Sequence, residues 1–253
     1  MPCIPKNIID KYIKNVSLDA LLSIIENAES PEAVKDCLRE DMDVDVFLDN
    51  FDEPINSVVL EVGSHDEPVA NILADAGYKV IGVDLRHYDK NLPNCNYEFI
   101  QSDFNSLPNE FIKINLGNID SIFSLSAIEH FGLGTYLEHY HAYYDVLATR
   151  QMWNLLKVGG TAYITVPFGN KFIEFVPHWR IYDMKSLQER VIQDFQVEEM
   201  LFFFSGETDF DGKLATTGQV VTKEEAMQYS GRLPHLTVFL KLRKISISRF
   251  SSL

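Results

Sequence analysis

The sequence predicts an α/β domain in which helices cover both faces of a mostly parallel sheet. From residue 57 onward, short apolar segments typical of buried strands alternate with longer segments of helical character. This alternation favours parallel strands joined by crossover helices. At 253 residues, 46% of them hydrophobic, the chain is long and apolar enough for one such domain with a full core.

The pattern places each element in turn. The predicted strands span residues 57–62, 79–83, 97–101, 119–125, 160–166, 197–204 and 235–243. The predicted helical segments lie near residues 68–76, 106–113, 136–157 and 183–194. Gly159 and Gly160 end the third of these helices, because glycine readily adopts the left-handed cap conformation. Residues 206–234 are polar and glycine-containing, and they predict a long loop insertion with one short helix before the last strand.

The chain divides near Pro54. Residues 1–54 are predicted to form a helical N-terminal extension, in which Ser30 caps a helix that begins at Pro31. An acidic run then leads to the boundary, and residues 55–253 form the main domain. The extension is expected to pack against the sheet edge, although it could instead act as a lid over a substrate.

Charge and cysteine content narrow the class of protein. The formal charge of −15 and the pI near 4.8 argue against binding to nucleic acid or to an anionic membrane surface. Cys3, Cys37 and Cys95 are odd in number and far apart, which favours a reducing, cytoplasmic compartment. The first residues lack the apolar core of a signal peptide, and no apolar run approaches the length of a membrane span.

The segment from Val58 to Asp84 indicates a nucleoside site. A buried strand ends at Gly63, a helix opens at Pro68, and a second buried strand closes on Asp84. A glycine turn lets the backbone pass beneath a ligand, and an acid at the end of the second strand accepts hydrogen bonds from ribose hydroxyls. A strand-to-helix turn without any ligand is the alternative.

The acid two residues before the glycine, in Glu61-Val-Gly63, resembles the class I S-adenosylmethionine-dependent methyltransferases. The resemblance implies a Rossmann-like, seven-stranded, mostly parallel sheet with an antiparallel last strand, and S-adenosylmethionine as cofactor. Glu61 would lie near the methionine end, Asp84 on the ribose and Asp103 on the adenine amino group. The full set of cofactor residues that it implies is Glu61, Gly63, His65, Asp84, Asp103, Phe104 and Ser126. The sequence departs from the family pattern at His65 and Glu67, where glycines are usual.

Three further motifs resemble a group of methyltransferases found among enzymes that modify polysaccharides and glycans. They run from Ser126 to Tyr136, from Thr165 to Gly169 and from Trp179 to Asp183. The whole resemblance extends over residues 57–204. It implies O-methylation of a sugar, a nucleotide-linked sugar or a related small metabolite, and thus a role in polysaccharide biosynthesis. Fold alone does not choose a substrate.

Two residues at the end of the fourth strand are candidates for catalysis. Methyl transfer to a hydroxyl requires an aligned acceptor and a base. His130 is a suitable base because its reference pKa is about 6.5, and Glu129 could orient the imidazole or contact the substrate. Alternatively, both residues only cap the following helix.

The resemblance places substrate-facing loops after the fifth strand, which nominates His178, Arg180 and Tyr182 as substrate-binding residues. The planar guanidinium of Arg180 would suit a carboxylate or phosphate. Its alternative is an ion pair with Glu174 or Asp183. Tyrosines at 136, 140, 143 and 144 have helical spacing and indicate core rather than a sugar platform.

A metal site is not expected, because Ser126 stands where related metal-dependent enzymes have a glutamate, and Glu129, His130 and a distant His178 do not form a coordination sphere. The expected partner is a small-molecule or glycan acceptor. Two other functions stay open. One is methyl transfer to a carboxylate or phosphorylated acceptor, and the other is a methyltransferase-like domain that has lost catalysis and serves as a scaffold.

Overall fold

The computed structural model describes residues 42–63, 69–87, 95–136, 138–206, 208–210, 213–231 and 235–246. Most of the predicted N-terminal extension lies outside these residues. Its described part contains a helix over residues 42–50, followed by an irregular segment with a turn at residues 55–56 that leads into the first strand.

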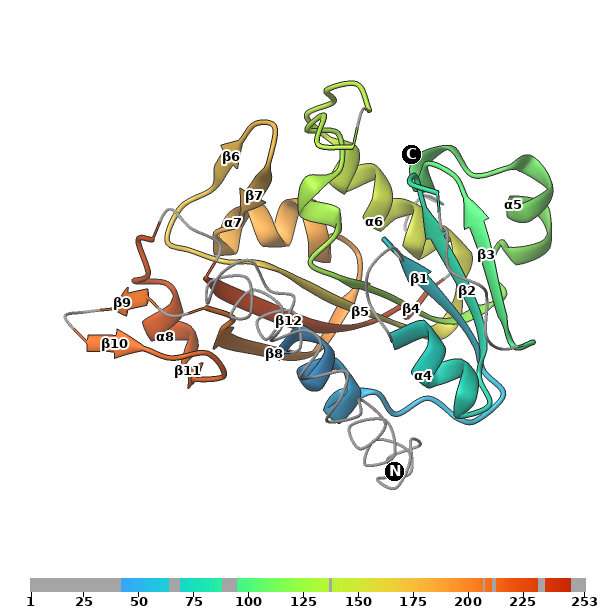
Figure 1. The fold of residues 1–253 in the computed structure, drawn as a ribbon, viewed down its shortest axis with the longest axis horizontal. Coiled ribbons are helices and arrows are strands. Elements are labelled where there is room, and N and C mark those ends of the chain that lie inside the picture. Colours follow the sequence, from blue (N-terminus) through green and yellow to red (C-terminus); the bar gives the residue numbers. More distant parts are fainter. Residues whose placement is uncertain are drawn as a thin grey trace, which may run out of the picture.

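A central sheet organises the described residues (Figure 1). Its strand order is β11-β8-β12-β5-β4-β1-β2-β3. These strands are β1 (Val58–Val62), β2 (Lys79–Asp84), β3 (Tyr97–Gln101), β4 (Ile119–Leu125), β5 (Leu156–Pro167), β8 (Gln196–Phe204), β11 (Val220–Val221) and β12 (Leu236–Arg243). Strands β1 to β5 are mutually parallel, whereas β12 runs antiparallel to both β5 and β8. The seven predicted strands and the antiparallel last strand are therefore confirmed, and β11 is a short addition at the edge.

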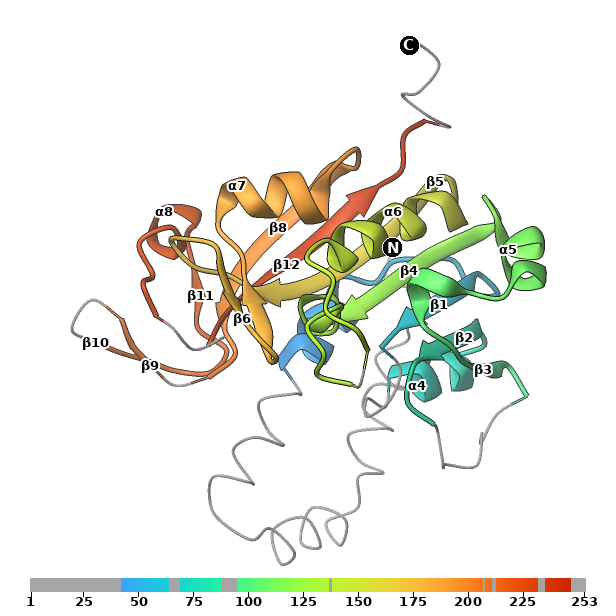
Figure 2. The ribbon, with the colours of Figure 1, turned by 90° about the horizontal axis from the view of Figure 1, so that it is seen from above.

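Helices cover both faces of the sheet (Figure 2). Besides the helix of residues 42–50 and two short 3-10 helices, the described helices are α4 (Val69–Asp75), α5 (Asn109–Asn115), α6 (Tyr144–Leu155), α7 (Met184–Ser186), the π-helix η3 (Leu187–Ile192) and α8 (Lys223–Ala226). The helix of residues 42–50 shares one apolar cluster with α4 and with side chains of one sheet face. The other face packs against α6 and η3. None of the helices among the described residues is long and apolar enough to cross a membrane.

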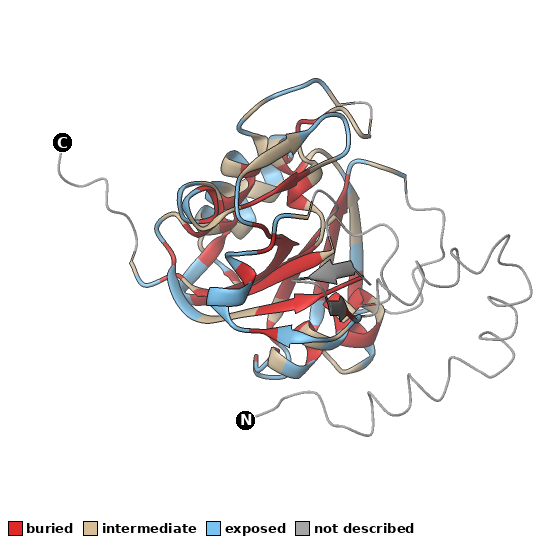
Figure 3. Ribbon diagram, turned by 90° about the vertical axis from the view of Figure 1, so that its left-hand side faces the viewer, coloured by how far each residue is buried: buried red, intermediate tan, exposed pale blue. Residues whose placement is uncertain are grey.

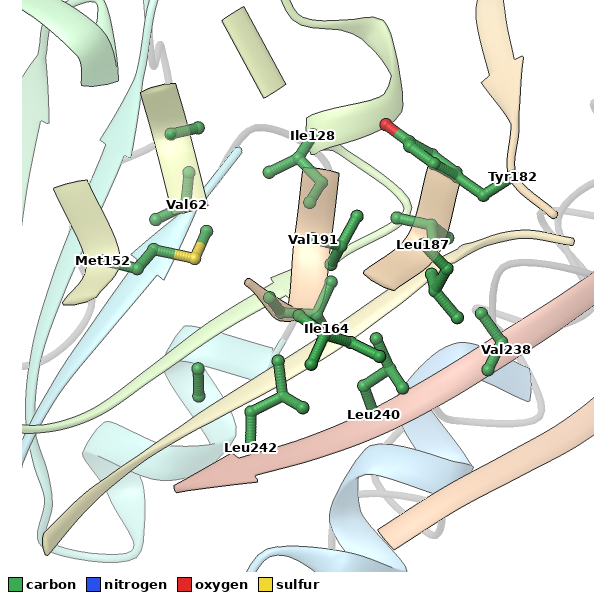
Figure 4. Packing of buried hydrophobic residues seen from close by; sticks show 14 of the residues in the cluster. Val62, Ile128, Met152, Ile164, Tyr182, Leu187, Val191, Val238, Leu240 and Leu242 are labelled. Atoms are coloured by element: carbon green, nitrogen blue, oxygen red, sulfur yellow. The ribbon is translucent and has the colours of Figure 1, made fainter. Parts of the chain in front are cut away.

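Strand side chains fill the space between sheet and helices. On the face that carries α6 and η3, Ile164 of β5 and Leu240 of β12 lie beneath Met152 and Val191 (Figure 4). The central strands are buried along most of their length (Figure 3). Burial on both faces explains why these strands are continuous apolar runs that the sequence reveals.

The predicted helix over 136–157 is wrong in its first third, since α6 begins only at Tyr144. Before it, the chain folds back on itself, and the His141 N–H donates to the Gly132 carbonyl at 2.7 Å. Gly132 has φ +72°, and a Cβ there would lie 2.5 Å from the His141 oxygen. The tyrosines at helical spacing therefore do not share one helix.

The excursion after β8 has structure of its own. It contains a hairpin of β9 (Thr208–Phe210) and β10 (Lys213–Ala215), then β11 and α8. The short helix predicted here is present as α8, and the side chain of Thr222 accepts a hydrogen bond from the Glu225 N–H to cap it.

Candidate active site

A cavity of about 450 Å³ opens at the edge of the sheet where β1, β2 and β4 end. This edge is where the strand order reverses between β1 and β4, the position at which open α/β sheets bind ligands. The volume lies within the range of roughly 300–1,000 Å³ typical of small-molecule sites. Seven predicted site residues line it: Gly63, Asp84, Asp103, Phe104, Ser126, Glu129 and His130.

The remaining predicted site residues are elsewhere. Glu61 is buried within β1 and does not line the cavity. His65 lies outside the described residues. His178 is exposed, and Arg180 and Tyr182 are interior residues that do not reach the cavity wall.

Gly63 holds the loops after β1 and β4 close together. Its φ is +90°, and a Cβ at this position would lie 2.5 Å from the Ala127 Cβ. Its N–H donates to the Val83 carbonyl at 2.9 Å, so the turn is fixed to β2 as well. Only glycine satisfies both the backbone conformation and the approach.

Asp84 is held at the cavity wall by Arg86. The carboxylate is 7% exposed and accepts from the Arg86 backbone N–H at 2.7 Å and from its Nε and Nη2 at 3.0 Å each. The Arg86 guanidinium in turn lies 4.4 Å from the centre of the Tyr136 ring. Arg86 therefore orients the predicted ribose acid, and a ligand at Asp84 would share the carboxylate with it.

The end of β3 supplies Asp103 and Phe104. The Asp103 carboxylate accepts from the Asn105 N–H at 2.8 Å and so caps the 3-10 helix η1 (Phe104–Ser106). Phe104 is buried next to it. Asp103 therefore stabilises the turn after β3, and it also lines the cavity.

Ser126 is strained, and its neighbours hold it in place. It has φ +45°, which is unusual for a residue other than glycine. Its N–H donates to the Thr165 Oγ1 at 2.8 Å and its hydroxyl donates to Asp43. The Thr165 hydroxyl also donates to Asp43, at 2.9 Å. A buried acid from the 42–50 helix thus reaches the cavity wall, and the acidic run around it was the only sequence signal of this role.

Glu129 is a buried carboxyl on the cavity wall. It lies in the 3-10 helix η2 (Ile128–His130), it is 2% exposed, and its Oε2 has no hydrogen-bond partner among the described residues. Burial raises its pKa well above the ordinary value, and the nearby charge of Asp43 raises it further. A ligand that donates a hydrogen bond would satisfy this oxygen.

His130 is arranged as a neutral base. Its Nδ1–H donates to the His178 carbonyl, which leaves Nε2 as the unprotonated nitrogen. Nε2 lies 3.8 Å from the Glu129 Oε1. Burial lowers the pKa of His130, although the hydrogen bond to His178 opposes this shift. His178 therefore contributes its backbone carbonyl to the site.

Arg180 lies behind the cavity wall and does not line it. It is fully buried, and its Nε donates to Glu174 at 2.9 Å, the ion pair that was the alternative expectation. Its Nη1 donates to the Phe131 carbonyl at 2.7 Å and to the Glu129 carbonyl at 3.3 Å. Arg180 thus fixes the loop that carries Glu129 and His130 from behind.

Tyr182 likewise belongs to the core (Figure 4). Its hydroxyl donates to Asp145 at 2.9 Å, and burial raises its pKa well above the ordinary value. The side chain of Tyr182 points toward α6 and does not line the cavity.

Other lining residues were not predicted as site residues from the sequence. They come from the ends of β5 and β8, the start of β12 and the hairpin strand β7 (Trp179–Ile181), and they are Pro167, Ser205, His235, Thr237 and Trp179. The Trp179 ring stacks on Phe175 of β6 (Ile173–Phe175), with centroids 5.5 Å apart and planes at 20°. No group of three His, Cys, Asp or Glu side chains that could hold a metal ion occurs among the described residues.

A family described as "Caenorhabditis protein of unknown function, DUF268" matches residues 78–250. The chain belongs to this family. The DUF268 match includes the Asp84, Asp103 and His130 segments and runs through β12, whereas Asp43 and Gly63 precede it. No protein of curated function matches the sequence.

Solved structures give the fold of this DUF268 chain. It is similar to the 1,6-didemethyltoxoflavin-N1-methyltransferase of Burkholderia thailandensis, solved with 1,6-didemethyltoxoflavin and S-adenosylhomocysteine (13% identity, 95% of this chain, 89% of the other, TM-score 0.51). It is also similar to a proposed S-adenosylmethionine-dependent methyltransferase of Listeria monocytogenes (11% identity, 82% of this chain, 99% of the other, TM-score 0.53). A third similar structure is an S-adenosylmethionine-dependent methyltransferase from Methanosarcina mazei (12% identity, 76% of this chain, 94% of the other, TM-score 0.50). The chain therefore has the class I methyltransferase fold.

Proposed function

We propose that this protein is an S-adenosylmethionine-dependent methyltransferase that methylates a hydroxyl group of a sugar or a related small metabolite. One observation carries the proposal: a single cavity at the reversal point of a methyltransferase-like sheet gathers Gly63, Asp84, Glu129 and His130. An acid, a glycine turn and a neutral imidazole are the groups that such a reaction needs.

The residues present fit the cofactor. Asp84 would accept hydrogen bonds from the ribose and Asp103 from the adenine amino group, with Phe104 beside the ring. Gly63 lets the loops after β1 and β4 meet at the cavity wall, because a Cβ there would clash with Ala127. When bound, the cofactor supplies an electrophilic methyl group. Glu61 lies beneath this loop and would act through the backbone rather than by contact.

The base in this proposal is the Nε2 of His130. It would take the proton of the acceptor hydroxyl as the oxygen forms its bond to the methyl carbon and the carbon–sulfur bond breaks. The hydrogen bond to the His178 carbonyl sets the tautomer, and the lowered pKa keeps the ring neutral near pH 7. Glu129 lies close enough to stabilise the imidazolium that forms.

A sugar-like acceptor fits the outer part of the cavity. The stacked Phe175 and Trp179 rings lie on the hairpin that borders it, and Phe175 is exposed. Aromatic faces of this kind suit the apolar face of a sugar ring. A carboxylate or phosphate acceptor has less support, because Arg180, the cation nominated to hold it, is buried behind the loop.

The test is transfer of a labelled methyl group from S-adenosylmethionine to neutral glycosides, nucleotide-linked sugars and sugar phosphates. We expect label in a sugar product together with formation of S-adenosylhomocysteine. Label in none of them, with intact binding of S-adenosylhomocysteine, would reject the sugar acceptor. Such a result would favour the scaffold function.

A further inference from the structure

We infer that Asp43 and Glu129 form an acceptor subsite that takes an uncharged, hydroxyl-bearing group and excludes anionic acceptors. This inference rests on the proposed function and narrows its substrate class. The subsite is the part of the cavity bounded by the 42–50 helix, the η2 turn and the ends of β5, β8 and β12.

The strand order of the sheet separates this subsite from the residues proposed to bind the nucleoside part of the cofactor. Asp84 and Asp103 follow β2 and β3, on one side of the reversal between β1 and β4. Ser205 follows β8 and His235 precedes the antiparallel β12, on the other side. A molecule that spans the cavity therefore has its nucleoside at one end and its reacting group at the other.

The unsatisfied oxygen of Glu129 points to a ligand. The side chain is 98% buried, it lines the cavity, and its Oε2 has no hydrogen-bond partner among the described residues. A buried acceptor atom without a partner is costly to the fold unless a ligand supplies the donor. A hydroxyl of the acceptor supplies one.

Asp43 reaches the same part of the cavity from the 42–50 helix. It is 5% exposed, and the hydroxyls of Ser126 and Thr165 both donate to its Oδ2. These bonds fix the carboxylate at the wall next to Glu129, and its charge contributes to the raised pKa of Glu129. Two neighbouring carboxyl groups favour a ligand that donates protons in hydrogen bonds, such as a pair of adjacent hydroxyls.

No lysine or arginine lies on the described wall of this subsite to balance an anion. Arg86 is the one Lys or Arg among the described lining residues, and it is paired with Asp84 on the nucleoside side. Arg180 directs its guanidinium at backbone carbonyls and Glu174 behind the loop. A carboxylate or phosphate would therefore meet the Asp43 carboxylate, with no lysine or arginine on the described wall of the subsite to hold it.

An analogue of the cofactor tests the subsite without a known acceptor. In sinefungin a carbon that bears an amine replaces the sulfonium, so a proton-donating cation stands where the methyl group is transferred. Wild-type protein should bind sinefungin at least tenfold more tightly than S-adenosylhomocysteine by calorimetry. Glu129→Gln and Asp43→Asn should each remove most of this preference and leave S-adenosylhomocysteine affinity within about threefold.

Glu138→Gln is the matched control, because it removes a charge from the same cavity wall on the other side of the loop. It should change the affinity for both ligands equally. Thermal unfolding of each variant checks that it folds. Equal binding of both ligands by the wild type, or an equal loss of both in Glu129→Gln, would overturn the subsite. If neither ligand binds to the wild type, the proposed function itself fails and the subsite with it.

Discussion

His130 is the residue on which turnover depends most in this account. His130→Gln and His130→Ala should each reduce turnover by about 10²–10⁴-fold, the contribution of a positioned base. Affinity for S-adenosylhomocysteine should stay within a few-fold, because the imidazole faces the acceptor. Steady-state rates and calorimetry on the same preparations measure both quantities. Near-normal turnover in both variants would make His130 a structural cap.

The pH dependence of turnover follows from the direction in which the pKa of His130 is shifted. Burial lowers the pKa of His130 below its ordinary value of 6.5, so the neutral, basic form persists to more acidic pH. The rate should therefore be flat near pH 7 and fall only as the pH drops below about 6.5. A pH profile of turnover measures this limb, and His130→Gln should lack it. A limb centred above pH 7 would mean that another group titrates.

Residues at strand ends could be predicted from the sequence, whereas residues placed by distant elements could not. Asp84 and His130 follow apolar strands, and the fold brings such ends to one edge. Asp43 reaches the site only because its helix packs beside β5, 122 residues away along the chain. Arg180 is buried by contact with Phe131, 49 residues earlier. No local pattern encodes either contact.

At the scale of elements, a buried ion pair joins α6 to η3. Asp145 is fully buried and accepts from the Arg190 Nη2 and Nε at 2.7 Å each, and from the Tyr182 hydroxyl. Asp145→Ala leaves a partly buried cation without its partner. It should lower the free energy of unfolding by about 3–5 kcal/mol, as measured in urea.

An exposed ion pair gives the control for this variant. Lys113 and Glu110 pair at 2.7 Å on the surface of α5, with both side chains mostly in solvent. Lys113→Ala should change the free energy of unfolding by about 1 kcal/mol at most. Equal effects of the two substitutions would show that the Asp145 pair does not hold the helices together.

The sequence predicts the boundaries of elements well where a strand is buried along its length, and poorly where the backbone turns. The apolar runs of β1, β4 and β12 are buried along most of their length, so the strand ends predicted from the sequence are close to the observed ends. The helix before β5 is predicted too long, because the tyrosines that precede it have the spacing of residues on one face of a helix. The positive φ of Gly132, which bends the chain there, depends on the contact with His141. The two-residue β11 is too short to show a pattern.

At the scale of the whole molecule, the cavity depends on the approach of two loops at Gly63. Gly63→Ala combines a positive φ with a Cβ 2.5 Å from that of Ala127. It should lower the free energy of unfolding by about 2–5 kcal/mol, since the strain costs about 1–2 kcal/mol and overpacking about 1–3 kcal/mol. It should also weaken binding of S-adenosylhomocysteine.

Gly117→Ala separates these two contributions. Gly117 also has a positive φ, +69°, but nothing lies within 4 Å of the Cβ position. This variant should show the backbone strain alone, about 1–2 kcal/mol, and leave ligand affinity unchanged. If Gly63→Ala were no more damaging than Gly117→Ala, the approach of the two loops would not matter for the cavity.

The binding of S-adenosylhomocysteine at Asp84 tests the central claim most directly. Calorimetry should show binding by the wild type and an affinity at least tenfold lower in Asp84→Ala, because a charge-assisted hydrogen bond contributes about 1.5–3 kcal/mol. Arg86 would keep its stacking on Tyr136 in that variant, so the loop should stay folded. Equal affinity in the two proteins, or no binding by the wild type, would contradict the claim that this cavity holds the cofactor.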